Sequence, residues 1–151
     1  MPRALQLPRD AHDKILAHCH REYPKEACGI LAGQDGEVIS GGEARRAVEV
    51  YPMTNVEGSP IGYSMDPREQ LALDKRMRAR RQRLFGIYHS HTASDAYPSP
   101  VDVNLAISPD ISYVVVSLKD RARPVVRSYT IDGAAIVEES LLLEDASPGT
   151  R

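Results

Sequence analysis

Two apolar runs constrain the fold of this chain more than any other feature of its sequence. Leu84–His89 (LFGIYH) and Tyr113–Leu118 (YVVVSL) consist mainly of aromatic, aliphatic and β-branched residues, which is typical of strands buried at the centre of a sheet. Between them, Ser99–Asp102 (SPVD) has the composition of a helix start, and this helix must end before Pro109. The sequence therefore predicts two central strands with a short helix between them.

The remaining segments add two longer helices and several short strands. Apolar residues spaced four apart indicate a helix over Pro8–Glu22, which must stop before Pro24. Asp66 can cap a second helix that has Pro67 at its first position and reaches about Gln82. The predicted short strands are Ala27–Ala32, Gly36–Ile39, Ala47–Tyr51, Val125–Thr130 and Ala134–Val137, the first two and the last two forming hairpins. This order predicts an α+β fold, a mixed β-sheet flanked by helices.

Composition and charge limit the kinds of protein that this chain can be. With 151 residues and 42% apolar side chains, it is long enough for one domain with a substantial core. Nineteen basic and twenty-one acidic side chains give a net charge of −2, which argues against nucleic acid or an anionic membrane as a partner. No apolar run approaches the ~20 residues that span a bilayer, and the first residues lack the apolar region of a signal peptide. We therefore expect a cytoplasmic protein.

The C-terminal end has a different composition from the rest of the chain. After Leu143 the segment EDASPGTR is polar, contains proline and glycine, and has little to bury. We therefore predict a domain over residues 1–143 and a flexible tail over residues 144–151.

The cysteine content restricts the metal chemistry that is available. Cys19 and Cys28 form neither a disulfide framework nor a CxxC pair, so any metal must be held mainly by histidine and carboxylate. The absence of CxxC also argues against a zinc deaminase, which uses HxE with a PCxxC pair. We expect Cys28 to be a small buried side chain.

A candidate metal site follows the first apolar run. His89 and His91 are two residues apart, so in an extended strand they point to the same side about 6.5 Å apart and can converge on one zinc ion. Asp102, in the first turn of the short helix, can supply a third ligand. Three protein ligands leave the fourth tetrahedral position open, as in catalytic zinc sites. If Asp102 were absent, His89 and His91 would be interpreted more simply as polar residues at the end of a strand, without a metal.

Two further residues could complete a hydrolytic site. Glu26 lies in the turn before an apolar strand and could move a proton between a water molecule, activated by zinc to a pKa of ~7, and a leaving amine. The alternative is a solvated loop charge. Ser99 could donate a hydrogen bond to the oxyanion of a tetrahedral intermediate. Its spacing from Asp102 equally fits a helix cap, which would turn its oxygen toward backbone N–H groups.

These residues together resemble the signature of the JAMM (MPN-plus) metalloprotease family. The match comprises His89-Ser90-His91, seven residues, Ser99, two residues and Asp102, with Glu26 upstream in EACGILAG. The stretches PKEACGILAG, YPMTNVEGSP, YHSHTASDAYPSPVDVNLA and YVVVS are similar to the small bacterial Mec-type members. The resemblance implies a cytidine-deaminase-like α-β-α fold, one Zn²⁺ per chain bound by the two histidines and the aspartate, Glu26 as general acid/base, and Ser99 at the oxyanion.

The resemblance also implies a substrate. Mec-type members hydrolyse the cysteine adduct at the C-terminus of a ubiquitin-like sulfur-carrier protein and release cysteine. The chain lacks the long insertions of polyubiquitin-specific members, which favours a short, exposed tail ending in Gly-Gly. Two alternatives stay open: an isopeptidase that removes ubiquitin-like proteins from lysine, and a non-catalytic MPN interaction module.

A basic segment, two tyrosines and three histidines can be explained by their structural roles alone, and for some of them a functional role stays open. Six of the nine residues Lys75–Arg83 are basic, which fits a solvated helix face or a docking patch for an acidic carrier. Tyr88 and Tyr97 could shape a substrate groove or pack in the core. The three histidines of the first helix are expected on an exposed face: His12, His18 and His20.

Overall fold

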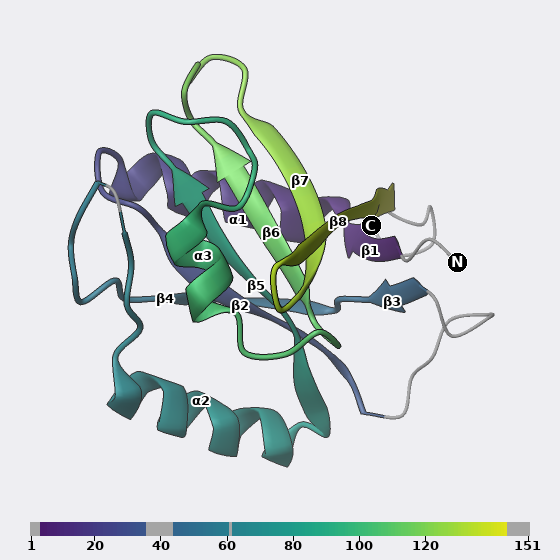
Figure 1. Cartoon of the computed structure of the whole chain (residues 1–151). Helices are drawn as coiled ribbons and strands as arrows, with labels where there is room; N and C mark the ends of the chain where they lie inside the picture. Colours follow the sequence, from purple (N-terminus) through teal and green to yellow (C-terminus); the bar gives the residue numbers. More distant parts are fainter. Residues whose placement is uncertain (1–3, 36–43, 61, 145–151) are drawn as a thin grey trace.

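The computed structural model describes residues 4–35, 44–60 and 62–144. Within these residues, eight strands form one sheet in the order β3-β1-β8-β7-β6-β5-β2-β4 (Figure 1). The strands are β1 Ala4–Pro8, β2 Cys28–Gln34, β3 Ala44–Arg46, β4 Glu49–Met53, β5 Gln82–His91, β6 Ser112–Ser117, β7 Val125–Asp132 and β8 Ala135–Glu144. The helices are α1 Arg9–Glu22, α2 Pro67–Ala79 and α3 Pro100–Leu105. None of the described helices combines the length and apolar character needed to cross a membrane.

The sheet curls because β3 and β4, which follow each other in the chain, lie at its two opposite edges. β3 pairs with β1 at one end of the strand order, and β4 pairs with β2 at the other. Ala47 and Val48 join them: the Ala47 N–H donates to the Gln6 carbonyl and the Val48 N–H to the Ala32 carbonyl. The two end strands of the sheet are therefore joined by only two residues of chain, so the eight-stranded sheet is curled.

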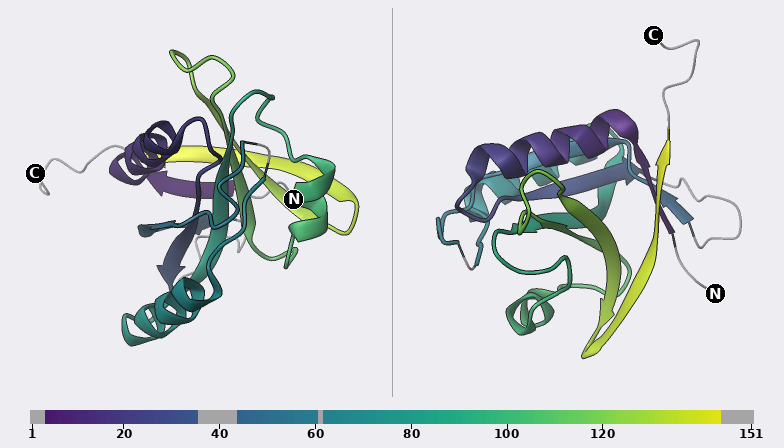
Figure 2. Two further views of the ribbon diagram at one scale, coloured as in Figure 1. Left: turned by 90° about the vertical axis from the view of Figure 1, so that its left-hand side faces the viewer. Right: turned by 90° about the horizontal axis from the view of Figure 1, so that it is seen from above.

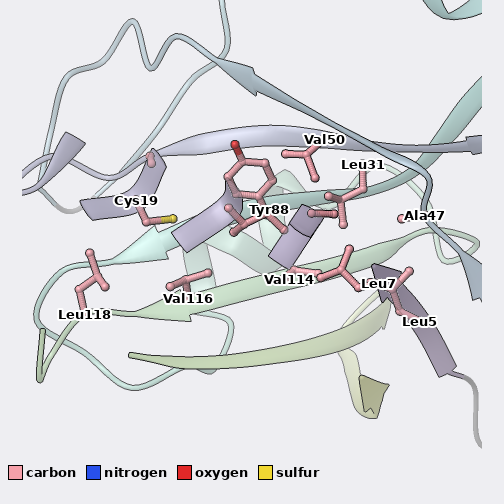
Figure 3. Packing of buried hydrophobic residues seen from close by; sticks show 13 residues of the cluster. Leu5, Leu7, Cys19, Leu31, Ala47, Val50, Tyr88, Val114, Val116 and Leu118 are labelled. Carbon is pink, nitrogen blue, oxygen red and sulfur yellow. The ribbon is translucent and has the colours of Figure 1, made fainter. Parts of the chain in front are cut away.

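Side chains alternate along β5 between two cores. Tyr88 faces α1 in a core that also contains side chains of β1, β2 and β6 (Figure 3). Ile87 faces the other way and packs with residues that belong to the α2 and α3 sides of the sheet. Figure 2 (right) shows α1 and α3 on opposite sides of the strands. Since His89 and His91 have the parity of Ile87, they lie on the α2 and α3 side.

The Tyr88 ring crosses β2 at a position that only glycine permits. Gly29 pairs with Tyr88 across the antiparallel ladder. A Cβ atom on Gly29 would lie 2.1 Å from Tyr88 Cε2, so any larger residue would displace the ring. Tyr88 is fully buried, and its hydroxyl lies 2.7 Å from His18 Nδ1 on α1. This packing holds α1 against the strand that carries the two candidate zinc ligands.

The predicted α+β sheet with flanking helices is confirmed, and several boundaries differ. The chain turns at Arg81, which has a positive φ of 55°, so α2 ends at Ala79 and Gln82 begins β5. β1 is absent from the sequence prediction. The predicted strand Gly36–Ile39 lies outside the described residues, and within them β2 pairs with β4 and β5 instead. Of the predicted strand at 47–51, residues 49–51 belong to β4, whereas Ala47 and Val48 form the link between β3 and β4.

The C-terminal boundary stays a prediction. β8 runs through Glu144, one residue beyond the predicted end of the domain at Leu143. The rest of the predicted tail, residues 145–151, lies outside the described residues.

The prediction of an exposed face for the helix α1 histidines is wrong for His18. Its side chain is buried beside Cys19, with the Tyr88 hydroxyl as its partner. Burial lowers the pKa of His18, which favours the neutral ring. His20 is exposed and His12 is partly exposed, as expected.

Candidate active site

The end of β5 and the start of α3 bring three candidate zinc ligands together. β5 and β6 run parallel, so the chain must cross from the C-terminal end of β5 back to the start of β6, and α3 lies in this crossover. His89 and His91 project from the end of β5, and Asp102 lies in the first turn of α3. The structure therefore brings together the three residues whose spacing in the sequence suggested a metal site.

The three ligand atoms form a nearly equilateral triangle. The Nε2 atoms of His89 and His91 lie 3.1 Å apart, and Asp102 Oδ2 lies 3.1 Å from the first and 2.9 Å from the second. Ligand atoms around a tetrahedral zinc with ~2.0–2.1 Å bonds are about 3.3 Å apart. The triangle would need to widen by a few tenths of an ångström. All three side chains are buried, and their ligand atoms lie close enough together to hold one zinc ion.

The hydrogen bonds around the triangle also indicate a cation site. His91 Nδ1 lies 2.8 Å from the Asp95 carbonyl, which can only accept, so a neutral His91 directs its Nε2 lone pair at Asp102. Burial lowers the pKa of His89, which favours the neutral imidazole that binds metals. Burial acts in the same direction on His91, but Asp102, the Asp95 carbonyl and Glu26 together outweigh it and raise the pKa of His91. The cluster therefore attracts a positive charge, either a proton or a metal ion.

Glu26 is held opposite His91 by the ladder between β2 and β5. The Ala27 N–H donates to Ser90 Oγ at 2.8 Å, and the Ser90 N–H donates to the Ala27 carbonyl at 3.0 Å. This pairing continues the register of Cys28 with His89, and so places Glu26 beside the triangle. The side chain is 5% exposed, which rules out a solvated loop charge.

The environment of Glu26 suits a group that exchanges protons at neutral pH. Burial raises the pKa of Glu26 to about 7, with Asp102 and Glu57 acting in the same direction and His91 opposing them. A carboxyl group with a pKa near 7 is present in both protonation states at neutral pH, so it can accept a proton and later donate it.

Ser99 caps α3, which was one of the two roles open to it. Its Oγ accepts a hydrogen bond from the Asp102 N–H at 3.1 Å, and Asp102 Oδ2 accepts one from the Ser99 N–H at 2.8 Å. This reciprocal pair fixes Asp102 in the orientation that points Oδ2 at the two histidines. The Ser99 hydroxyl proton is not used by the cap, so capping does not prevent Ser99 from donating to an oxyanion.

The loop between β4 and α2 contacts several residues of the site, and the sequence did not predict these contacts. This loop contacts three parts of the site through Ser59, Pro60 and Tyr63. The Glu26 N–H donates to the Ser59 carbonyl at 2.9 Å, and Thr92 Oγ1 donates to the Pro60 carbonyl at 3.0 Å. The Tyr63 ring stacks on the His89 ring with centroids 4.8 Å apart. The segment YPMTNVEGSP is part of the family resemblance, but nothing in its sequence reveals these contacts.

Asn55 ties this loop to Glu26. Its Nδ2 donates to the Glu26 carbonyl at 2.8 Å and to the Gly62 carbonyl at 3.1 Å. Its Oδ1 accepts from the N–H groups of Glu57 and Ser64 at 3.1 and 3.0 Å. All four hydrogen-bonding positions of the amide are filled, so Asn55 fixes the backbone of Glu26 relative to the loop.

We expect Asn55→Asp to lower kcat about tenfold without removing zinc, because a carboxylate cannot donate to the Glu26 and Gly62 carbonyls. Steady-state kinetics and metal analysis on the same sample measure both effects. Asn104→Asp is the matched control, since Asn104 is exposed on α3 and its side chain has no hydrogen-bond partner among the described residues. Parent-level kcat in Asn55→Asp, or loss of its zinc, would contradict this role.

Comparison with known proteins places the chain in a family. The model of prokaryotic homologs of the JAB domain (Prok-JAB) matches residues 8–132. The chain belongs to the prokaryotic JAB family. A protein of Mycobacterium tuberculosis named CysO-cysteine peptidase is 43% identical over 135 residues, which cover 89% of this chain and 88% of the relative. A desampylase of Haloferax volcanii is 33% identical over 118 residues, covering 75% and 80%.

Solved structures agree with this assignment. A protein of Desulfitobacterium hafniense superposes on this JAB-family chain with a TM-score of 0.83, at 36% identity and 97% coverage of both chains. A protein of Salinibacter ruber has a TM-score of 0.70 at 23% identity, covering 92% and 91%, which supports the fold alone. The predicted resemblance to the JAMM family is therefore confirmed, and the JAMM family implies zinc at the His-His-Asp site.

The remaining candidate residues divide between core and surface. Tyr88 packs in the α1 core, so it does not line a groove. Tyr97 is 55% exposed and meets the Tyr129 ring edge-on at 5.5 Å. Cys28 is buried as predicted, and burial raises its pKa to about 12, which keeps the thiol protonated.

Most of the basic run is engaged by this molecule itself. Arg78 pairs with Asp74 at 3.0 Å and Arg80 with Glu49 at 2.8 Å. The guanidinium groups of Arg76 and Arg83 lie 5.2 and 5.4 Å from the ring centres of Tyr51 and Phe85. A docking role for Lys75–Arg83 stays a prediction.

Proposed function

We propose that this protein is a zinc metallopeptidase that cleaves after the C-terminal Gly-Gly of a ubiquitin-like sulfur-carrier protein and releases cysteine from a carrier–cysteine adduct. The observation that carries the proposal is the buried triangle of His89, His91 and Asp102 with Glu26 beside it. The 43% identity to a CysO-cysteine peptidase supports cysteine as the released group. A non-catalytic module would have no need to bury a fourth ionisable group there.

One zinc ion per chain would be held by His89 Nε2, His91 Nε2 and Asp102 Oδ2. When bound, zinc supplies Lewis-acid activation of water and of the substrate carbonyl. The protein's own residues supply the proton transfers and the geometry. Glu26 accepts a proton as water adds to the carbonyl and delivers it to the nitrogen as the C–N bond breaks. The Ser99 hydroxyl donates to the oxyanion of the tetrahedral intermediate.

The sheet offers an edge to which the carrier tail can add. β4 is at one end of the strand order and, among the described residues, pairs with β2 alone. Met53 at the end of β4 shares a row with Cys28 and His89, so the edge ends two strands from a zinc ligand. An extended tail paired with this edge would reach the zinc site, and Gly-Gly would let its backbone approach closely.

A second candidate is an isopeptidase that removes ubiquitin-like proteins from lysine side chains. It is favoured by the similarity to the desampylase and by 38% identity over 104 residues, 68% of this chain, to a probable TtuB-protein conjugate cleaving protease of Thermus thermophilus. The two candidates share a mechanism and differ in the leaving group.

Mass spectrometry of two matched substrates separates them. One is a folded carrier ending in Gly-Gly-cysteine, and the other is the same carrier joined through Gly-Gly to a lysine side chain. We expect the zinc-loaded protein to convert the first to the carrier ending in Gly-Gly plus free cysteine, with kcat/KM at least tenfold above that for the second. An intact cysteine adduct beside a cleaved lysine conjugate would establish the isopeptidase instead.

A further inference from the structure

We propose that a cavity beyond the zinc site binds the α-carboxylate of the released amino acid, with Arg123 as its cationic partner. This inference rests on the proposed function and names the part of the substrate that this region recognises. The cavity has a volume of about 620 Å³, within the range of small-molecule sites. Its lining includes Asp95, Tyr97, Lys119, Arg123, Arg127 and Glu138.

The register of the sheet places this cavity next to the candidate zinc ligands. His89 pairs with Val115, and Val115 pairs with Arg127, so the three residues form one row on the same face of the sheet. Strands are about 4.8 Å apart, so the Arg127 backbone is ~10 Å from that of His89. Asp95, which also lines the cavity, is nearer still to the candidate ligands, since its carbonyl is the partner of His91 Nδ1.

The same row shows which half of the substrate would face the cavity. On one side of His89 lie Cys28 and then Met53 at the β4 edge, where the carrier tail would add. On the other side lie Val115 and then Arg127, which lines the cavity. A tail that reaches the zinc site from β4 therefore directs its leaving group over β6 and β7. The cavity lies where the amino acid beyond Gly-Gly would project.

Three basic side chains, Lys119, Arg123 and Arg127, and three acidic ones, Asp95, Asp120 and Glu138, line the cavity, and among the basic ones Arg123 is available to a carboxylate. Asp120 accepts a hydrogen bond from the Ala122 N–H at 3.1 Å. Lys119 Nζ lies 3.4 Å from Asp95 Oδ1, and Arg127 Nη1 lies 3.1 Å from Glu138 Oε2, so both cations have acidic partners. The Arg123 side chain has no hydrogen-bond or ion-pair partner among the described residues. A guanidinium can bind a carboxylate through two parallel hydrogen bonds. A cysteine leaving group carries its α-carboxylate two bonds from the scissile nitrogen, whereas a lysine side-chain nitrogen carries none nearby.

The test compares two adducts of one carrier, ending in Gly-Gly-cysteine with either a free carboxylate or a carboxamide. We expect Arg123→Ala to lower kcat/KM about tenfold for the carboxylate adduct and less than twofold for the carboxamide. Arg121→Ala is the matched control, because Arg121 lies on the same loop but stacks on Tyr23, 4.4 Å from its ring centre, away from the cavity. The Arg121→Ala variant should cleave both adducts at the parent rate.

A binding measurement independent of turnover accompanies the kinetics. Free cysteine titrated into the isotope-labelled parent should shift the amide NMR signals of residues 95–97 and 119–127, and these shifts should be lost in Arg123→Ala. Arg123→Ala could lower kcat/KM equally for both adducts, or the cysteine-induced NMR shifts could persist in this variant. Either result would overturn the carboxylate site while leaving the proposed function intact. If the parent cleaves neither adduct, the proposed function itself fails.

Discussion

Replacing Glu26 with glutamine is expected to lower kcat by about 10²–10⁴-fold while the zinc content and the fold stay unchanged. Glutamine keeps the size of the side chain but cannot accept a proton from water or deliver one to the leaving amine. Glu26 faces the triangle from the β2 side and is not one of the three grouped ligands. Its loss should therefore separate proton transfer from metal binding.

Kinetics on the carrier–cysteine adduct and elemental analysis of the same sample test this separation. Glu57→Gln is the matched control, because Glu57 is an exposed carboxyl on the neighbouring loop that already influences the pKa of Glu26. We expect it to stay within a few fold of the parent. Turnover by Glu26→Gln within a few fold of the parent would remove Glu26 from the mechanism.

Replacing Asp102 with asparagine should remove most of the zinc and lower kcat by about 10³-fold or more, since several kcal/mol of charge stabilisation are lost with the metal. Asparagine retains an oxygen that can accept from the Ser99 N–H, so the cap of α3 can persist. His91→Ala should lose zinc as well, because it removes a second corner of the triangle.

Metal analysis after dialysis against a weak chelator reports the occupancy of each variant, and circular dichroism reports its fold. Asp95→Asn is the matched control, since the Asp95 side chain is 84% exposed and its backbone carbonyl, which holds His91, is unchanged. Full zinc occupancy in both Asp102→Asn and His91→Ala would refute the assignment of the ligands.

The residues close together in sequence were the ones that could be predicted. His89, His91 and Asp102 are separated by one strand end and one helix start, whose local geometry follows from the sequence pattern alone. The capping role of Ser99 was predictable for the same reason. The place of Glu26 was not, because it depends on the pairing of β2 with β5 across more than sixty residues of chain. The resemblance to the JAMM family supplied that link.

The features that sequence reasoning missed depend on tertiary packing. Asn55 and Tyr63 act through contacts with Glu26 and His89, 29 and 26 residues away, and no local pattern encodes these. β1 is a five-residue strand whose alternating burial is marked by only two buried residues, Leu5 and Leu7. His18 could have been placed in the core, since it lies three residues after the buried Ile15.

Metal removal tests most directly whether zinc at this centre drives the release of cysteine. The carrier–cysteine adduct is incubated with chelator-treated protein, with the same protein after one equivalent of zinc, and with zinc-treated Asp102→Asn. The carrier mass and free cysteine are then measured by mass spectrometry. We expect no release by the first, parent-level release by the second and little by the third. Equal release with and without zinc, or none after zinc is restored, would contradict the account.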